Sequence, residues 1–223
     1  MRESYMLPEK LNISFDKKKQ IKNDYEKFSD KFPYNVEKYI LDNYNLDISS
    51  NYNGYDIKNP FGKAPGQLSI NIKQVQNDLK SGLGFVVLKS VSSVNPYEKN
   101  RLPKNNYKKR KMKVEKIISK SGREGWTVTW KGVGWPRSFE DYLDFMEKSL
   151  KLSKKHNTLV VPSCQFKVPN KYKNFDLENY KFTTESLIKV WENIFPNKKL
   201  PLEIDFSQTV WRNKITNKEK TLY

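Results

Sequence analysis

The sequence contains only one cysteine, Cys164, and only one histidine, His156. A single cysteine excludes an internal disulfide and is typical of a reducing compartment, so we expect a cytoplasmic protein. One histidine and one cysteine are too few for a cluster of metal ligands, and we predict no metal site. The sequence also lacks a nucleophile–histidine–acid set, a glycine-rich phosphate loop and a dinucleotide fingerprint, so it excludes several common enzyme classes.

Long apolar runs are absent too, and no window of about 18 apolar residues predicts a transmembrane helix. Arginine is scarce, since only 6 of the 42 basic residues are arginines, although the formal net charge is +17. Such a charge raises nucleic acid as a partner, but arginine is the better ligand for phosphates and bases. With only one alanine beside abundant lysine and asparagine, the composition indicates coding bias. We therefore favour surface lysines over nucleic-acid binding, which stays an alternative.

The chain is organised around two short runs, 59–66 and 84–90, with a helical pattern between them. The first run, Asn-Pro-Phe-Gly-Lys-Ala-Pro-Gly, ends in small residues, and the apolar spacing that follows predicts a helix over 70–81. The second run, Gly-Phe-Val-Val-Leu-Lys-Ser, is apolar at consecutive positions, as strands covered on both faces of a parallel sheet are. Together they predict a βαβ unit, and such sheets bind ligands at the carboxyl ends of their strands.

The remaining patterns predict an alternation of helices, hairpins and strands. They are helices over 16–28 and 35–46, a hairpin over 51–58 turning at Asn53-Gly54, a basic loop over 92–112, a hairpin from 114–118 and 126–130, a helix over 139–155 capped by Ser138, a strand over 158–164, a helix over 180–195 capped at Thr183 or Thr184, and a strand over 201–207. Their order predicts an α/β fold of repeated parallel units.

These stretches resemble the dihydroorotate dehydrogenase family, whose members are FMN-binding (β/α)8 barrels. The likeness is carried by 59–66 with 84–90, by Gly-Val-Gly-Trp-Pro at 132–136 before Tyr142-Leu143-Asp144, and by Glu-Ile-Asp-Phe-Ser at 203–207. It runs from about residue 51 to about 210 and implies the first half of a TIM barrel, four βα units. Residues 1–50 would be a helical N-terminal extension and 211–223 a polar tail. The extension is read as two helices packed under the barrel, with membrane or partner binding as the alternative.

The resemblance also implies site residues. Ala64, Pro65 and Gly66 would pass under the flavin ring of FMN, and Lys89 with Ser90 would approach it from the second strand. A cation near N1 and O2 of the flavin stabilises the anionic reduced ring, which is the physical reason for a lysine there. The substrate would lie against the loop Lys131-Gly132-Val133-Gly134 and against Asp205.

The sequence departs from the family pattern where the chemistry takes place. The position of the catalytic base is Gln208, whose amide cannot accept a proton at physiological pH. Asparagines of the pattern are replaced by Lys131, Asp205 and Val210, and Asp205 would repel the carboxylate of an orotate-like substrate. Ser207 is adjacent to the base position, but neighbouring strand residues point to opposite faces. The catalytic residue therefore stays unknown.

The single cysteine and the single histidine are candidates for a catalytic role, and each also has a structural explanation. Cys164 ends a predicted buried strand, where a single cysteine is more often a small buried hydrophobe than a nucleophile. His156 stands at a predicted helix end, where a cation complements the helix dipole. We read neither as catalytic.

Three functional hypotheses follow. The first is a flavin-dependent oxidoreductase acting on a small, pyrimidine-like molecule, its barrel completed by a second copy or a separate chain. The second is an inactive, truncated remnant of such an enzyme, whose open sheet edges would favour association. The third is a nucleic-acid-binding protein that uses the basic loop over 92–112, which salt-dependent retention on DNA or RNA would reveal.

Overall fold

The computed structural model describes residues 13–98, 111–131, 134–166 and 177–205. The chain divides into two compact units, Met1–Asp47 and Ile48–Tyr223. In the described part of the chain, no helix combines the length and the apolar character needed to cross a bilayer.

The first unit contains the helices α1 (Phe15–Lys27) and α2 (Val36–Tyr44), which confirms the two helices predicted for this segment. Polar side chains join them: Asp24 accepts hydrogen bonds from the hydroxyl groups of Tyr39 at 2.7 Å and Tyr44 at 2.5 Å, and the Gln20 amide donates to the carbonyl of Asn43 at 3.1 Å. Neither helix contains a buried residue. These two helices are therefore held together by polar and edge contacts and not by buried apolar side chains of their own.

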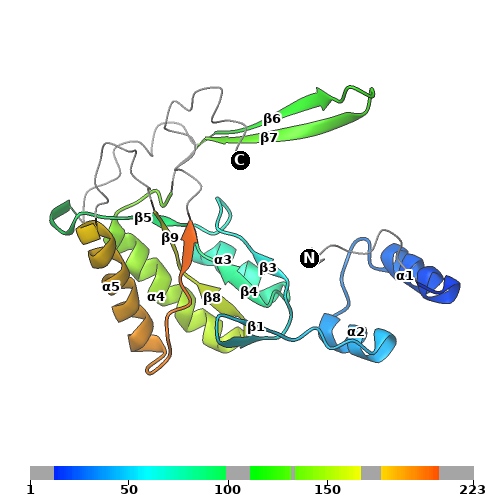
Figure 1. The fold of residues 1–223 in the computed structure, drawn as a ribbon, viewed down its shortest axis with the longest axis horizontal. Helices are drawn as coiled ribbons and strands as arrows, with labels where there is room; N and C mark the ends of the chain where they lie inside the picture. Colours follow the sequence, from blue (N-terminus) through cyan, green and yellow to red (C-terminus); the bar gives the residue numbers. More distant parts are fainter. Residues whose placement is uncertain (1–12, 99–110, 132–133, 167–176, 206–223) are drawn as a thin grey trace, which may run out of the picture. The chain divides into compact units, whose positions relative to one another are not determined.

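The described part of the second unit holds strands, three helices and a 3-10 turn (Figure 1). Its helices are α3 (Ile72–Lys80), α4 (Phe139–His156) and α5 (Leu177–Ile194), with the turn η1 (Pro96–Glu98). Its strands are β1 (Ser50–Tyr52), β2 (Tyr55–Ile57), β3 (Gly62–Lys63), β4 (Phe85–Val87), β5 (Val91–Ser92), β6 (Lys111–Ile118), β7 (Glu124–Lys131), β8 (Leu159–Val161), β9 (Ser163–Gln165) and β10 (Glu203–Asp205).

The parallel strands lie side by side in the order in which they follow along the chain. β3 pairs with β4, and β4 pairs with β8. β5 and β9 follow β4 and β8 closely in sequence and pair with each other, and β10 pairs with β9. Paired parallel strands are connected through a helix, as repeated βα units require: α3 lies between β3 and β4, α4 between β4 and β8, and α5 between β9 and β10. The α/β class is thus confirmed, while the strands of the described part do not form a closed barrel.

Both predicted hairpins are confirmed as antiparallel pairs. β1 and β2 meet at a tight turn in which Asn53 and Gly54 adopt φ values of 49° and 87°, the left-handed conformation that this dipeptide favours. β6 and β7 form a longer ladder than the sequence predicts, with a register that runs from Lys111 opposite Lys131 to Ile118 opposite Glu124. The first two residues of β6, Lys111 and Met112, lie within the segment predicted to be a basic loop.

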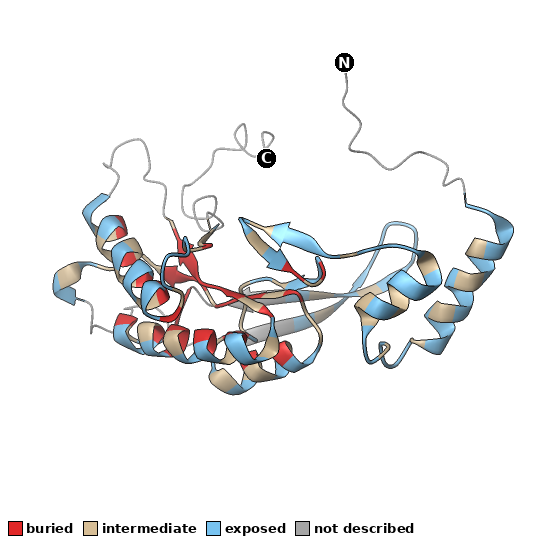
Figure 2. Cartoon of the chain, turned by 90° about the horizontal axis from the view of Figure 1, so that it is seen from below, coloured by how far each residue is buried: buried red, intermediate tan, exposed pale blue. Residues whose placement is uncertain are grey.

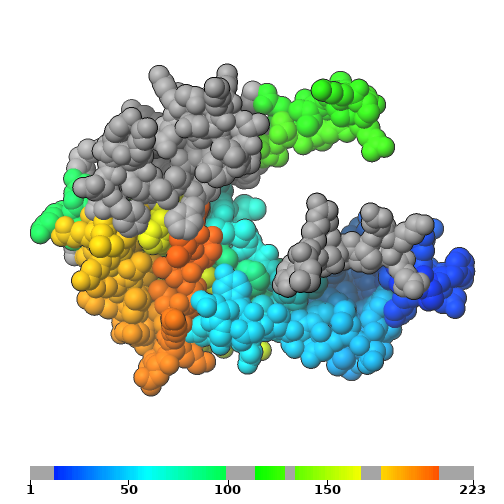
Figure 3. Space-filling model, viewed as in Figure 1, coloured from blue at the N-terminus to red at the C-terminus, as the bar shows by residue number. Residues whose placement is uncertain are grey.

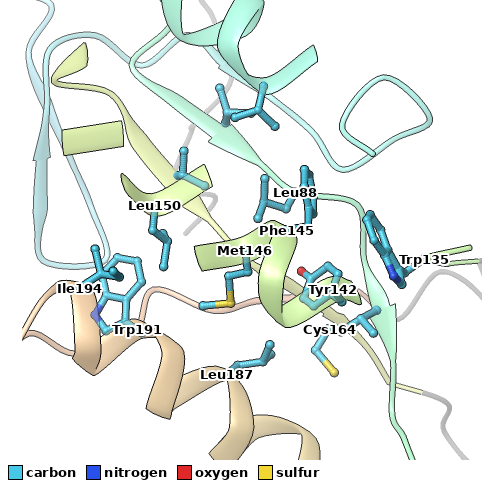
Figure 4. Packing of buried hydrophobic residues seen from close by; sticks show 14 of the residues in the cluster. Leu88, Trp135, Tyr142, Phe145, Met146, Leu150, Cys164, Leu187, Trp191 and Ile194 are labelled. Carbon is cyan, nitrogen blue, oxygen red and sulfur yellow. The ribbon is translucent and has the colours of Figure 1, made fainter. Parts of the chain in front are cut away.

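The apolar core lies between the sheet and the three helices of the second unit, and Figure 2 shows buried residues gathered on the strands and on one side of the helices. Helix α4 is central to it, because apolar residues at three- and four-residue spacing put one whole face into the core. The cluster is labelled in part in Figure 4 and includes Val75, Leu79, Val86, Leu88, Val91, Trp135, Tyr142, Phe145, Met146, Leu150, Val160, Cys164, Leu187 and Trp191.

The ends of the helices test the predicted caps. Ser138 caps α4 as predicted and forms a capping box with Asp141, in which each side chain accepts a backbone N–H of the other residue. The predicted cap of α5 at Thr183 or Thr184 is wrong, because the helix already begins at Leu177. The Thr183 hydroxyl instead donates to the carbonyl of Asn179 at 2.7 Å and accepts from the backbone of Val94 at 2.9 Å. A threonine inside a helix often makes such a bond one turn back.

Candidate functional site

The two faces of β9 separate apolar from polar side chains. Cys164 points into the core formed with the helices, near Tyr142 (Figure 4). Its neighbours Ser163 and Gln165 point to the opposite face, as alternation along a strand requires. There Ser163 donates a hydrogen bond to Glu203, and the Gln165 amide donates to Asp205 at 3.4 Å. The face away from the helices is therefore polar at the carboxyl ends of β9 and β10.

A chain of hydrogen bonds extends this polar face across three successive parallel strands. The Ser90 hydroxyl, just before β5, donates to Asp205 Oδ2 at 3.1 Å, and the Ser92 hydroxyl donates to Gln165 Oε1 at 3.1 Å. Ser90 is 0% exposed and Gln165 is 2% exposed. We call Ser90, Ser92, Gln165 and Asp205 the carboxyl-edge cluster. It lies at the end of the sheet where parallel α/β proteins bind ligands.

Gly134, which follows the second hairpin in sequence, lies directly against this cluster. Gly134 adopts φ +63°, and a Cβ added there would come within 3.1 Å of the Ser92 hydroxyl and 3.4 Å of the Ser90 carbonyl oxygen. The adjacent Trp135 fixes the loop, because its ring stacks on Phe145 at 4.9 Å within the core. The structure thus brings the predicted residues Ser90, Gly134 and Asp205 together.

Lys89 and Glu203 add charge beside the cluster. Burial raises the pKa of Glu203, the hydrogen bond from Ser163 lowers it, Asp205 raises it and Lys89 lowers it. The ammonium of Lys89 therefore lies within electrostatic range of the Glu203 carboxylate. Among the described side chains, two carboxylates and one ammonium share this edge of the sheet, which allows it to stabilise charge on a ligand or to exchange a proton.

The loop after β3 contains the other predicted flavin contacts. It runs alongside the second strand, because the backbone N–H of Lys89 donates to the carbonyl of Ser69 at 3.1 Å. Ala64 is exposed, and the nearest atom to a Cβ added at Gly66 is the Ala64 carbonyl oxygen at 3.9 Å, so there is room beside this loop. The Ser69 hydroxyl is buried and has no hydrogen-bond partner in the described structure.

Arg137 connects the segment after β3 with the segment that contains Gly134 and Trp135. The Arg137 guanidinium donates to the carbonyl of Ile70 at 3.1 Å and lies over the Trp135 ring at 4.6 Å. Because Ile70 follows Ser69 directly, the loop that contains Gly134 and the loop that contains Ala64 are connected. Their arrangement does not depend on the sheet alone.

The lone cysteine does not belong to the site. Burial raises the pKa of the Cys164 thiol to about 12, with smaller contributions from Asp205 and Glu203. Its side chain packs within the apolar core, on the face opposite the carboxyl-edge cluster. His156 is the last residue of α4, and the left-handed residue that ends the helix is Asn157 at φ 47°.

We expect Cys164 to react slowly with a thiol reagent in the native protein, because thiolate is the reactive form and both burial and the raised pKa suppress it. The rate with iodoacetamide at pH 8 should be at least about a hundredfold below that of the denatured chain. Mass spectrometry of the labelled protein measures both rates. Native labelling within a few-fold of the denatured rate would contradict the buried position.

Several predicted site residues lie outside the described residues: Gly132, Val133, Ser207, Gln208 and Val210. Lys131 is placed only as the last residue of β7, opposite Lys111. Their assignments stay predictions.

Sequence reasoning missed Ser92, Gln165, Ser163 and Glu203 as members of this edge. The missed signal is the alternation of side chains along a strand, which puts residues two apart on the same face. The register of β9 with β10 then places Ser163 beside Glu203 and Gln165 beside Asp205. Polar residues repeating at that interval in an otherwise apolar strand could have indicated them.

Comparison with known proteins finds a loose structural likeness only. No protein-family model matches the chain, and no curated protein matches it. Similar solved structures include morphinone reductase in complex with tetrahydroNAD, at 7% identity and a TM-score of 0.30, over 70% of this chain and 62% of that chain. A mutant of the same reductase in the same complex gives a TM-score of 0.29 at 7% identity, with the same coverage of both chains. We draw neither fold nor function from a likeness of this size.

Proposed function

We propose that the second unit binds the flavin of FMN at its carboxyl edge and belongs to an oxidoreductase acting on a small molecule. The observation that carries this proposal is the hydrogen-bonded cluster that joins the buried Ser90 and Gln165 to Asp205 across three successive parallel strands beside Lys89. The resemblance to the dihydroorotate dehydrogenase family supports it, since Lys89, Ser90, Gly134 and Asp205 are residues at which that resemblance implies ligand contacts.

The chemistry of these side chains fits the polar edge of a flavin ring. That edge presents an acceptor, O2, a donor, N3–H, and a second acceptor, O4. Lys89 offers a cationic donor, Asp205 a carboxylate acceptor, and Gln165 an amide that both donates and accepts. The space beside Ala64 and Gly66 suits a flat ring.

Each group would have a distinct task in such a site. The bound flavin would supply the acceptor for a hydride from the substrate. Lys89 would stabilise negative charge that builds up near it, as a cation placed in advance does most effectively away from water. Glu203 could hold a proton, because burial raises its pKa. Gly134 would lie against the site, next to Ser92 and Ser90, where a larger residue would intrude.

Dihydroorotate itself is not the substrate that we favour, because the family's base position is occupied by Gln208. A second copy of the chain or a separate chain would complete the barrel in this proposal. An inactive remnant and a nucleic-acid-binding protein are the alternatives, and neither requires flavin binding.

We expect Lys89→Ala to weaken FMN binding by about tenfold or more, the size of a lost charge-assisted hydrogen bond. Quenching of flavin fluorescence during titration with the protein measures the affinity. Lys73→Ala is the matched control, because Lys73 is an exposed lysine of helix α3, and it should bind FMN like the wild type. Equal affinities for all three proteins would contradict the role of Lys89.

A further inference from the structure

We propose that the hairpin of β6 and β7 docks on a bilayer surface that contains anionic phospholipids. This inference goes beyond the proposed function, because it concerns a surface outside the carboxyl-edge cluster and does not require a bound flavin. It rests on two observations: an exposed apolar face on the hairpin, and the concentration of the chain's positive charge in the same segment.

The hairpin has one largely apolar face. Residues directly opposite each other in an antiparallel pair project from the same face, as do residues two apart along a strand. By this rule one face of the ladder carries four apolar side chains that are between 46% and 69% exposed: Val114, Ile118, Trp126 and Val128. The opposite face contributes Ile117 as its one described apolar side chain. The hairpin is therefore amphipathic.

The charged residues on the apolar face compensate each other. Lys116 lies opposite Trp126, Glu124 lies opposite Ile118, and their side chains form an ion pair at 2.7 Å. None of the side chains described over 114–128 is buried, and none belongs to the core cluster. A two-stranded ribbon alone is only marginally stable in water and gains from a layer over its apolar side. Exposed apolar surface of this kind is typical of an interaction site.

The charge of the segment selects an anionic partner. Residues 101–131 contain eleven lysines and arginines and two glutamates, so this segment has a net charge of +9, out of +17 for the whole chain. Coding bias alone would spread lysine along the sequence, whereas this short segment holds more than half of the net charge. Lys120 and Arg123, in the turn between the two strands, are exposed. A second copy of so basic a hairpin would be repelled.

A bilayer with anionic headgroups matches both features at once. Its surface attracts clustered lysines and arginines. Aliphatic and tryptophan side chains enter the boundary between headgroups and acyl chains, where an aromatic ring with one polar atom is favoured. A nucleic acid would pair the charges but leave Val114, Ile118 and Val128 against a polar backbone. Stacking platforms for single strands also use several aromatic rings, whereas Trp126 is the one described on this hairpin.

Co-sedimentation of the full chain with lipid vesicles tests the proposal. Phosphatidylcholine vesicles with about 30% phosphatidylserine should bind the protein at least about tenfold more strongly than phosphatidylcholine alone. Raising the salt to about 0.5 M should remove most of this difference. Ile118→Ser should lower the partition coefficient by about fivefold or more. Leu177→Ser is the matched control, because Leu177 of α5 is also 68% exposed, and it should bind like the wild type.

A pair of charge variants tests the electrostatic part. Lys120→Gln combined with Arg123→Gln should lower binding to the phosphatidylserine vesicles by about tenfold or more. Lys73→Gln combined with Lys80→Gln is the control, since it removes two exposed lysines from helix α3. Its binding should fall by less than about threefold, because those charges lie outside the hairpin.

A dye attached to one face or the other tests the orientation. A fluorophore that brightens in apolar surroundings is attached to Ile118→Cys, on the apolar face, or to Thr127→Cys, on the opposite face. The native Cys164 is buried and should stay unlabelled. Vesicles with phosphatidylserine should raise the fluorescence at position 118 at least about threefold more than at position 127.

Three results would overturn the proposal: equal binding to both kinds of vesicle, wild-type binding by Ile118→Ser, or an equal response of the dye on the two faces. Retention on DNA or RNA without vesicle binding would assign the hairpin to a nucleic acid and contradict it. So would a dimer, seen by light scattering without vesicles, that Ile118→Ser abolishes. A melting curve of each variant establishes that it is folded.

Discussion

Replacing Gly84 by alanine is expected to lower the free energy of unfolding by about 3 kcal/mol or more, because nothing nearby can make room for the new methyl group. A Cβ at this position would overlap the carbonyl oxygen of Asn59 and lie 2.9 Å from its carbonyl carbon. Both are backbone atoms of a fully buried residue. Gly84 also donates to the carbonyl of Phe61 at 2.8 Å and accepts from Leu159 at 3.1 Å, so any shift disturbs three strands.

A thermal melt followed by circular dichroism measures this effect, and the midpoint should fall by roughly 10 °C. Gly66→Ala is the control, because the nearest atom to its added Cβ lies at 3.9 Å. Its midpoint should stay within about 2 °C of the wild type. A Gly84→Ala protein that melts with the control would show that the first two strands of the sheet do not approach as closely as described.

Replacing Trp135 by alanine is expected to cost about 3–5 kcal/mol, the usual range for removing a buried aromatic side chain. Trp135 is 2% exposed, stacks on Phe145, and contacts the Tyr142 ring at 5.3 Å. Its indole N–H donates to the Ser138 carbonyl at 2.9 Å, just before helix α4 begins. Its loss would release the loop that holds Gly134 against the carboxyl-edge cluster, so ligand binding should weaken as well.

Chemical denaturation followed by circular dichroism gives the change in stability. Trp126→Ala is the matched control, because the Trp126 side chain lies on hairpin strand β7 and is 69% exposed. Removing it should change stability by less than about 1 kcal/mol. Similar losses in the two variants would contradict the buried position of Trp135.

The sequence predicted those parts of the fold that depend on local patterns. The consecutive apolar residues before Lys89 identified a buried strand, the dipeptide Asn53-Gly54 identified a hairpin, and Ser138 identified the start of α4. These signals succeed because neighbouring residues decide them. The cap predicted at Thr183 failed for the converse reason: its hydroxyl has a partner one turn back and another in Val94, which no local pattern reveals.

The candidate site was predicted only in part, because its contacts join distant parts of the chain. Ser90 and Asp205 are 115 residues apart in sequence, and Ser92 and Gln165 are 73 apart. The resemblance to a known family identified Ser90 and Asp205, but Gln165 belongs to a strand whose polar face becomes visible only through its register with β10. Figure 3 shows the β10 segment, in orange, at the surface beside helix α5, so one side of this edge strand is accessible.

The measurement that tests FMN binding most directly is a fluorescence titration of FMN with the wild-type chain, followed by desalting and an absorption spectrum. Binding at the carboxyl edge predicts saturable quenching and a flavin band that stays with the protein, both weakened in Lys89→Ala. Unchanged flavin fluorescence at all protein concentrations, together with a colourless desalted protein, would contradict the proposed function.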